Sequence, residues 1–443
     1  MKRFRSVCAA LAVLIAVLGL SVGIAQAQQK VTITYWVDPR FSYVEGYPGT
    51  QFPGDFEMIQ AKKFMEMHPN VEIKVEVIPW ADLSVRIPAA IAAGSPPDIL
   101  RDYLGRTSVY AKEGLLEPLN EVLPQAFIDR IDPSFRELYT IDGELHAIPL
   151  YAWAATAVAN RALWAAIGQE ELIDRAVERG SWTFEEFEEA MRAVAKRGLW
   201  PLGMEIPPDG QADYYYLAFF WGYGARVFEE GDYSRVALNT PAGVQALTKL
   251  VEWAKEGLIQ PGAPTATRDQ LDGMMWRGQV AVRFSDPGIW TRFNAAKAEG
   301  RVTTEVDLVP VPYPTEEGVQ AGMAVGPTGL AIFKQQDPVK RQLVLEFAQF
   351  LAQEEYIYTY SRNAGQFPAF TGIDDPFFDQ PHMSQISAWL AEKGTEDTGT
   401  TLPIYTEIRA RLAPEIQAAI MGVKTPAKAL ADFEAAANRI LNR

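Results

Sequence analysis

Tryptophan is the residue type whose number and placement in this sequence suggest a chemical role. All eleven tryptophans follow residue 27, and several lie beside turn-forming residues, among them Trp36, Trp80, Trp153, Trp221 and Trp290. An indole ring offers a flat apolar face to the C–H face of a sugar, while nearby Asp, Glu, Arg and Asn side chains can bond its hydroxyls. A tryptophan can equally fill a hydrophobic core, so the set as a whole, and no single member, indicates a carbohydrate site.

Motifs for enzymatic chemistry are missing from the sequence. There is no G-x-x-x-x-G-K-[ST] phosphate loop, no G-x-S-x-G elbow and no H-E-x-x-H helix. The segment Gly222-Tyr223-Gly224 lacks the third glycine of a dinucleotide-binding loop. The three histidines, His68, His146 and His382, are far apart, which favours structural roles over metal binding. We therefore expect no catalytic residue, no metal site and no cofactor.

Adjacent carboxylates are the remaining candidates for catalysis, because glycoside hydrolysis uses a pair of them. Such pairs occur at Glu185-Glu186, Glu188-Glu189 and Asp374-Asp375. With 56 acidic residues in the chain they are expected by chance, and those of residues 185–189 lie largely on the polar side of a predicted helix. A solvated helix face is the favoured interpretation, and a secreted carbohydrate-active enzyme stays as the alternative function.

Helices and strands alternate along the chain. Residues 56–67 have helical apolar spacing and end at His68-Pro69-Asn70, and residues 71–78 alternate as a strand does. A further strand is expected to end at Asp98-Ile99-Leu100, with a helix between it and Gly114. This alternation predicts an α/β sheet covered by helices on both faces. Residues 37–54 form the longest irregular stretch, typical of a binding loop.

Four further helix starts are marked by capping residues. Thr183 and Glu186 have the spacing of a capping box, followed by an apolar stripe to residue 197. In three places a capping residue precedes a proline at the first helical position, namely Thr240-Pro241, Asp337-Pro338 and Thr425-Pro426.

The first 27 residues have the three parts of an export signal. Basic residues precede an apolar core from Val7 to Leu20, and Ala25-Gln26-Ala27 supplies a cleavage pattern. Cleavage after Ala27 would remove Cys8, the only cysteine, so the mature protein would have no disulfide. The formal net charge of -15 argues against nucleic acid and anionic lipid as partners. A chain of 443 residues also predicts two domains.

The order of short motifs resembles the extracellular solute-binding proteins of family 1, which serve ABC-type importers of sugars and glycerol phosphate. The similarity covers nearly the whole mature chain and rests on these segments: Val31 to Trp36, Phe64 to Ile73, Ala92 to Ile99, Tyr110 to Leu119, Asp142 to Pro149, Asn160-Arg161, Ser181 to Phe187, Gly278 to Val282 and Gly365 to Pro368.

This resemblance implies a periplasmic-binding-protein fold of type II, an α/β fold of two lobes with the ligand between them. It assigns residues 1-27 to the signal peptide, 28-149 plus 327-375 to the N-terminal lobe and 150-326 plus 376-443 to the C-terminal lobe. The hinge strands would cross near Pro149 and near Val325 to Thr328. The expected protein is monomeric and periplasmic, does not insert into the membrane, and delivers a carbohydrate to an ABC transporter permease.

The ligand residues implied by the resemblance come from both lobes and from the crossing. They are Trp36, Asp38, Arg40, Trp80, Asp82, Arg101, Asp102 and Arg106 from the first lobe, and Trp153, Trp221, Ser285, Asp286, Trp290 and Tyr405 from the crossing and the second lobe. The long loop alone suggests adding Phe41, Tyr43 and Glu45.

Departures from the family pattern bear on the ligand. Maltose-binding members have a glutamate at the first crossing where this chain has Trp153. After the third strand they have a tryptophan and an aspartate–arginine pair where this chain has Asp102 and Gly105-Arg106, which argues against maltodextrin. Four arginines, Arg40, Arg101, Arg106 and Arg283, leave an acidic sugar or a sugar phosphate open, because guanidinium pairs bidentately with anions. A binding protein for an amino acid or a peptide is a third possibility.

Overall fold

The computed structural model describes residues 30–207, 212–229, 232–319, 321–396, 398–400, 402 and 404–442, apart from the side chains of residues 80, 81 and 84. The predicted export signal and Cys8 lie outside these ranges. None of the helices in these ranges is both long and apolar enough to span a bilayer.

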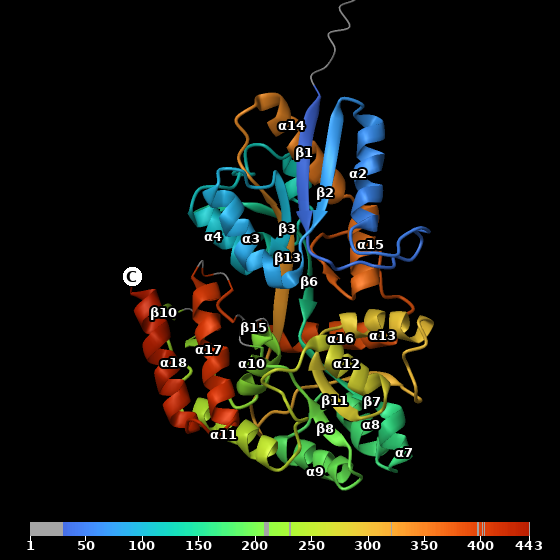
Figure 1. Cartoon of the computed structure of the whole chain (residues 1–443), viewed down its shortest axis with the longest axis vertical. Coiled ribbons are helices and arrows are strands. Elements are labelled where there is room, and N and C mark those ends of the chain that lie inside the picture. The colour runs from blue at the N-terminus through green and yellow to red at the C-terminus, as the bar shows by residue number, and fades with distance from the viewer. Residues whose placement is uncertain are drawn as a thin grey trace, which may run out of the picture.

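The N-terminal lobe is built on a mixed sheet with the strand order β14-β6-β13-β3-β1-β2, and β15 pairs with one end of β13 (Figure 1). The pairs β1–β2 and β1–β3 are parallel, whereas β13 runs antiparallel to β3 and β6. The strands are β1 (Val31–Val37), β2 (Val71–Val77), β3 (Ile99–Tyr103), β6 (Ala147–Ala154), β13 (Met323–Ile332), β14 (Phe367–Pro368) and β15 (Thr395–Glu396), with a separate β4 (Thr140–Ile141) and β5 (Glu144–Leu145) pair. The lobe's helices are α2 (Asp55–Met67), α3 (Trp80–Ala92), α4 (Leu104–Lys112), α5 (Gln125–Ile128), α6 (Pro133–Leu138), α14 (Pro338–Leu351) and α15 (Glu354–Ala364).

The C-terminal lobe has a four-stranded sheet of order β12-β7-β11-β8. Its strands are β7 (Thr156–Asn160), β8 (Trp200–Gly203), β11 (Val280–Ser285) and β12 (Leu308–Val311), with a separate β9 (Phe228–Glu229) and β10 (Asp232–Val236) pair. The helices are α7 (Arg161–Ala166), α8 (Glu170–Arg179), α9 (Phe184–Ala195), α10 (Asp213–Trp221), α11 (Pro241–Lys255), α12 (Arg268–Trp276), α13 (Gly288–Ala298), α16 (Pro381–Lys393), α17 (Tyr405–Ile420) and α18 (Pro426–Leu441).

Two long strands connect the lobes. β6 leads from the first sheet to β7 of the second, and β13 returns beside it, paired from Val325 opposite Ala154 to Ala331 opposite Ala147 (Figure 1). The expected crossing near Pro149 and near residues 325–328 therefore corresponds to this strand pair. Because two hydrogen-bonded strands resist sliding but can bend together, they suit a hinge.

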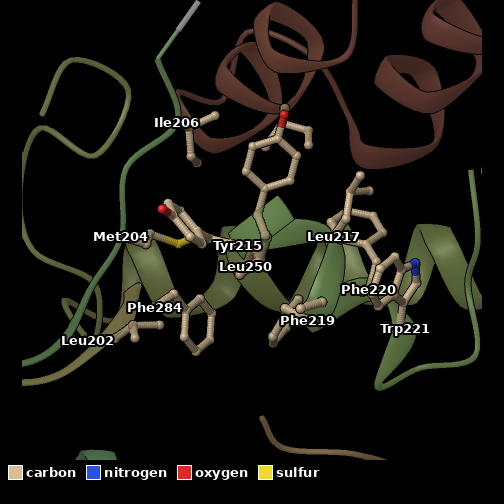
Figure 2. Close-up of a cluster of buried hydrophobic side chains, with 14 of the residues drawn as sticks. Leu202, Met204, Ile206, Tyr215, Leu217, Phe219, Phe220, Trp221, Leu250 and Phe284 are labelled. Atoms are coloured by element: carbon tan, nitrogen blue, oxygen red, sulfur yellow. The ribbon is translucent and has the colours of Figure 1, made fainter. Parts of the chain in front are cut away.

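Each lobe has its own hydrophobic core. In the N-terminal lobe α2 and α14 pack on the sheet, and Phe64 contacts both Phe347 and Phe350 at centroid distances of 5.0 and 5.5 Å. In the C-terminal lobe the aromatic helix α10 is buried along its length and packs with Leu202, Leu250 and Phe284 (Figure 2). Separate cores allow the lobes to move as rigid units.

Most sequence-based elements are confirmed. The helix before His68 is α2, and the alternating strand is β2. Thr183 and Glu186 form both bonds of a capping box at α9, and the three residues expected to cap helices with proline at the first position do so at α11, α14 and α18.

One strand prediction was wrong. The strand expected to end at Leu100 begins at Ile99 and continues to Tyr103. The extension exists because residues 99–103 pair with Thr328 to Ile332 of the returning strand β13, a partner more than two hundred residues away in the sequence.

Candidate functional site

Trp153 is placed at the centre of the interlobe region by the strand crossing. It lies near the end of β6 and pairs in register with Gly326 of β13. A Cβ atom on Gly326 would overlap the indole ring, so glycine there allows the ring to lie across the neighbouring strand. The other neighbours of the half-buried ring are Tyr214 and Tyr215 of α10, at centroid distances of 4.7 and 5.7 Å.

The first turn of α10 brings a charged group to the same place. Asp213 is fully buried and accepts hydrogen bonds from the Tyr405 hydroxyl, at 2.6 Å, and from the Arg409 guanidinium of α17. Burial raises the pKa of Tyr405 well above its ordinary value, so the phenol stays protonated and donates. The Arg409 guanidinium also lies 5.2 Å from the Tyr214 ring centroid and 5.7 Å from that of Tyr405.

The N-terminal lobe reaches this group through the end of β3. Tyr103 shares a hydrogen bond of 3.0 Å with Thr406 of α17, so the contact joins the two lobes. Behind it, Arg106 donates to both oxygens of Asp102 at 2.6 and 2.5 Å. We call the following set the interlobe cluster: Asp102, Tyr103, Arg106, Trp153, Asp213, Tyr214, Tyr215, Tyr405, Thr406 and Arg409.

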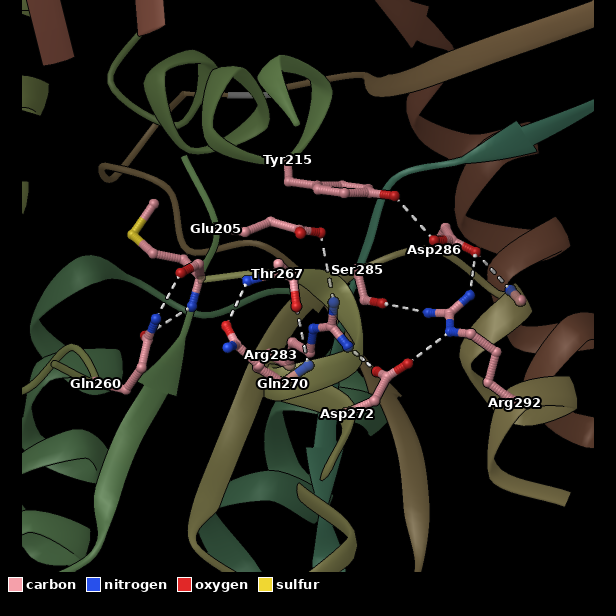
Figure 3. A network of polar contacts seen from close by, with 12 residues as sticks. Glu205, Tyr215, Gln260, Thr267, Gln270, Asp272, Arg283, Ser285, Asp286 and Arg292 are labelled. Atoms are coloured by element: carbon pink, nitrogen blue, oxygen red, sulfur yellow. Dashed lines mark hydrogen bonds and ion pairs between the residues drawn. The ribbon is translucent and has the colours of Figure 1, made fainter. Parts of the chain in front are cut away.

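A network of charges in the C-terminal lobe supports the cluster (Figure 3). Tyr215 donates to Asp286 at 2.8 Å, and the backbone N–H of Gly288 donates to the other Asp286 oxygen at 2.8 Å. Burial alone would raise the pKa of Asp286, but Arg292 and Arg268 hold that pKa below its ordinary value. Asp286 is therefore an anion that fixes the Tyr215 ring beside Trp153.

The network continues away from the cluster into the interior. Arg292 donates to Asp272 at 2.7 Å and lies 3.4 Å from both the Ser285 hydroxyl and Asp286. Asp272 also pairs with the completely buried Arg283, which in turn lies 3.4 Å from Glu205 (Figure 3). Two arginines thus share one carboxylate. Ser285 and Asp286, both predicted ligand residues, belong to this network.

Four predicted ligand residues form a buried unit inside the N-terminal lobe. Arg101 donates to Asp38 at 2.8 Å and is ion-paired with Glu57 of α2, while Arg40 donates to the other Asp38 oxygen at 2.9 Å. Phe41 is buried over the Arg101 guanidinium, with its ring centroid 5.2 Å from Cζ. These contacts all lie within the N-terminal lobe.

The remaining predicted residues are dispersed. Trp221 lies in the core of the C-terminal lobe (Figure 2), and one face of Trp290 is covered by His382, with centroids 4.3 Å apart and ring planes 11° from parallel. Trp36 is stacked under Arg86, and Asp82 is exposed on α3. The Trp80 side chain is outside the described part of the structure.

The long loop serves a different part of the N-terminal lobe. Tyr43 is 68% exposed, and Glu45 pairs with Arg362 of α15 at 2.8 Å. The next residues of the loop, with Tyr47, form one wall of a surface groove of about 1060 Å³ against α2 and α15. Residues Tyr43 and Glu45 therefore belong to this outer face in the conformation described.

Sequence reasoning missed several members of the cluster: Tyr103, Asp213, Tyr214, Tyr215, Thr406 and Arg409. One available signal was the run Asp213-Tyr214-Tyr215-Tyr216 opening an aromatic helix, because three consecutive tyrosines are more than a core requires. Nothing in the sequence near Tyr103 or Thr406 indicated that they meet. Among the described residues, no group of three or more His, Cys, Asp or Glu side chains is arranged to hold a metal ion.

The arrangement provides aromatic faces and hydrogen-bonding groups on both sides of a hinged strand pair. The family model for bacterial extracellular solute-binding proteins matches residues 49–357, and the chain belongs to this family. Its fold is the two-lobe architecture of periplasmic sugar-binding proteins.

Individual relatives are distant in sequence but match over most of their length. The chain is 23% identical to the diacetylchitobiose-binding protein of Streptomyces coelicolor over 424 residues, which are 93% of this chain and 90% of the relative. An ABC transporter solute-binding protein of Thermotoga lettingae, bound with α-D-tagatose, superposes with a TM-score of 0.75 at 19% identity, covering 93% of this chain and all of the other. The maltose-bound T. maritima protein gives a TM-score of 0.74 at 20% identity, covering 93% and 99%.

Proposed function

We propose that this chain is the extracytoplasmic substrate-binding component of an ABC-type carbohydrate importer. A sugar or short oligosaccharide would bind at the interlobe cluster, and the closed protein would deliver it to the permease. The observation that carries the proposal is the position of Trp153 on the crossing strands, with Tyr214 and Tyr215 on one side of the hinge and Tyr103 on the other. The relatives described above bind saccharides, which supports the same ligand class.

The pairing of the arginines favours an uncharged ligand. Arg40 and Arg101 are bonded to Asp38, Arg106 to Asp102, and Arg283 to Asp272. A guanidinium whose charge is already paired with a carboxylate gains less from a ligand anion, which would also have to displace or approach that carboxylate. These four arginines therefore lend no support to a sugar phosphate, although the sequence left that ligand open.

Binding would follow the general mechanism of hinged proteins. A ligand shifts the population toward the closed form only by contacting both lobes better there than in the open form. Trp153 lies on the crossing strand and can contact the ligand in both forms, whereas Tyr103 and Tyr214 approach one another across the lobes. Indole stacking on a sugar face combined with hydrogen bonds to hydroxyls provides the affinity.

Native mass spectrometry of freshly purified protein tests the proposal directly. We expect a co-purified mass of one or a few hexose units that is lost on denaturation. A tryptophan-fluorescence screen against neutral mono-, di- and trisaccharides should then identify a responding sugar. In Trp153→Ala we expect the affinity for that sugar to fall by about five- to thirtyfold, because a stacked ring contributes on the order of 1–2 kcal/mol.

Trp200→Phe is the matched control. Trp200 is also half-buried in the C-terminal lobe, and it pairs with Val280 at the start of β11. The site lies toward the other end of that strand, where Ser285 contacts the network below the cluster. The affinity of the Trp200→Phe variant for the responding sugar should equal that of the wild type. A silent screen, or equal losses in both variants, would contradict the proposed site.

An enzymatic role makes a different prediction. A general acid for glycoside hydrolysis needs a carboxyl group with a raised pKa near a second carboxylate. Asp286 has a lowered pKa, and Arg106 donates to both oxygens of Asp102. Burial raises the pKa of Asp213, but its two oxygens already accept hydrogen bonds from Tyr405 and Arg409. Appearance of reducing ends during prolonged incubation with the responding oligosaccharide would favour the enzyme instead.

A further inference from the structure

Tyr103 occupies an unusual position for a residue at the end of a core strand. It belongs to the N-terminal lobe through its β3 pairing with Thr328, yet its hydroxyl is hydrogen-bonded to Thr406 of the C-terminal lobe. The two residues are 303 positions apart in the sequence. The bond therefore exists only while the lobes are in the arrangement described.

Packing within the N-terminal lobe fixes the ring for this contact. The Arg106 guanidinium, itself anchored on Asp102, lies 4.3 Å from the centroid of the Tyr103 ring. On the first turn of α4, a Cβ atom at Gly105 would overlap Cε2 of Tyr103. Glycine at this position thus allows the ring to lie across the helix start, with its hydroxyl directed at the other lobe.

The partner surface in the C-terminal lobe is equally fixed. Thr406 lies in the first turn of α17, directly after Tyr405, whose hydroxyl is bonded to the buried Asp213. One turn further, Arg409 pairs with the same carboxylate, and its Cζ lies 5.8 Å from the Tyr103 ring centroid. Tyr103 is therefore near one guanidinium of its own lobe and a second guanidinium of the opposite lobe.

We propose that the lobe arrangement described here is the closed one and that Tyr103 is a positioning residue for binding, which stabilises this arrangement through Thr406 before any ligand contributes. Two preorganised surfaces meet with little loss of side-chain freedom, so the bond retains most of its favourable free energy. A protein whose closed form is already partly populated binds its ligand more tightly, because less of the binding free energy is spent on closing the lobes. This inference rests on the proposed function for its purpose, but closure itself can be measured without a ligand.

The experiment measures the distance between the lobes by double electron–electron resonance. Spin labels on Lys112→Cys and Arg439→Cys, which are exposed positions of the N- and C-terminal lobes, report closure. Where residues 1–27 are retained, Cys8→Ser avoids a third label. In ligand-free protein, Tyr103→Phe and Thr406→Val should each lower the closed-to-open ratio about three- to tenfold, the effect of one net hydrogen bond. The double variant should match either single variant, because both remove the same bond.

Two further variants make the result decisive. Tyr356→Phe is the control, since its ring packs on Phe350 within the N-terminal lobe, and it should leave the ratio unchanged. Gly105→Ala should open the protein by displacing the ring, with every hydrogen-bonding group retained. Distance distributions of Tyr103→Phe and Thr406→Val identical to those of the wild type, or effects that add in the double variant, would overturn the proposal.

The outcome is separable from that of the proposed function. If no saccharide binds but the two variants open the ligand-free protein, the positioning role stands and the ligand class fails. If saccharides bind while both variants have the closed-to-open ratio of the wild type, the ligand class stands and the positioning role of Tyr103 fails. When a responding sugar is known, the two variants should weaken its binding by the same factor as they lower the closed-to-open ratio.

Discussion

Each lobe contains an arginine with no exposed surface, yet the two are held differently. Arg101 of the N-terminal lobe has two carboxylates, Asp38 and Glu57, in contact with its guanidinium. Arg283 of the C-terminal lobe pairs with Asp272, which it shares with Arg292, and is 3.4 Å from Glu205. Each buried cation has two carboxylates and shares one of them with a second arginine, Arg40 or Arg292. The difference is that the positive charges of Arg292 and Arg268 act on Arg283.

The difference shows in the pKa values. Burial lowers the pKa of both guanidinium groups, but around Arg101 the two carboxylates outweigh burial and raise the pKa above its ordinary value. Around Arg283 burial is reinforced by the positive charges of Arg292 and Arg268, so its pKa falls to about 10. The N-terminal unit is thus a local structural anchor, and the C-terminal network is a shared system whose members can compensate for one another.

The strongest test removes each cation in turn. Arg101→Met leaves Asp38 and Glu57 buried with only Arg40 in contact, so we expect a loss of about 3–5 kcal/mol in the free energy of unfolding. Arg283→Met leaves Asp272 paired with Arg292 and relieves repulsion between cations, so its loss should be at most about 2 kcal/mol. Urea unfolding of both variants measures this. Equal losses would abolish the distinction between anchor and shared network.

Neutralising one carboxylate in each lobe sharpens the comparison. Asp38 accepts from two arginines at 2.8 and 2.9 Å, so Asp38→Asn should cost about 2 kcal/mol. Glu205 contributes only a 3.4 Å contact to Arg283, and Glu205→Gln should cost less than about 1 kcal/mol. The same urea titrations apply, and a larger loss for Glu205→Gln would mean that Arg283 depends on Glu205 more than on Asp272.

The smallest expected effect depends on pH. Burial against Trp290 lowers the pKa of His382 to about 4, below the ordinary value of 6.5. The unfolded chain therefore binds more protons between these values, and the stability from neutral His382, complete above pH 6.5, is lost as the pH falls toward 4. Because the ring is partly exposed, we discount this term to about 1 kcal/mol.

His382→Gln provides the measurement. From pH 7 to pH 4.5, the unfolding free energy of the wild type should fall by about 1 kcal/mol more than that of the variant, since all other titrating groups are shared. If the two pH profiles are parallel, protonation of His382 does not limit the stability of the C-terminal lobe.

Local patterns in the sequence determined most helices and their boundaries. The Thr183 and Glu186 capping box and the Asp337-Pro338 start were predictable because each depends on residues within one helical turn. The alternation of residues 71–77 predicted β2 because one face of that strand is more buried than the other. Trp153 could be predicted as a ligand residue through the family resemblance, since it lies near a recognisable crossing motif.

Tertiary structure alone decided how far β3 extends and which residues meet between the lobes. Tyr103 is in a strand because β13 pairs with it, and it contacts Thr406 because two separately folded lobes are placed together by their hinge strands. Likewise, the charge of Arg101 suggested a ligand contact, whereas burial beside Asp38 and Glu57 made it an internal anchor. Sequence patterns report neighbours within a few residues. The partners of Arg101 lie 63 and 44 residues away and the partner of Tyr103 lies 303 residues away, so only tertiary packing chooses them.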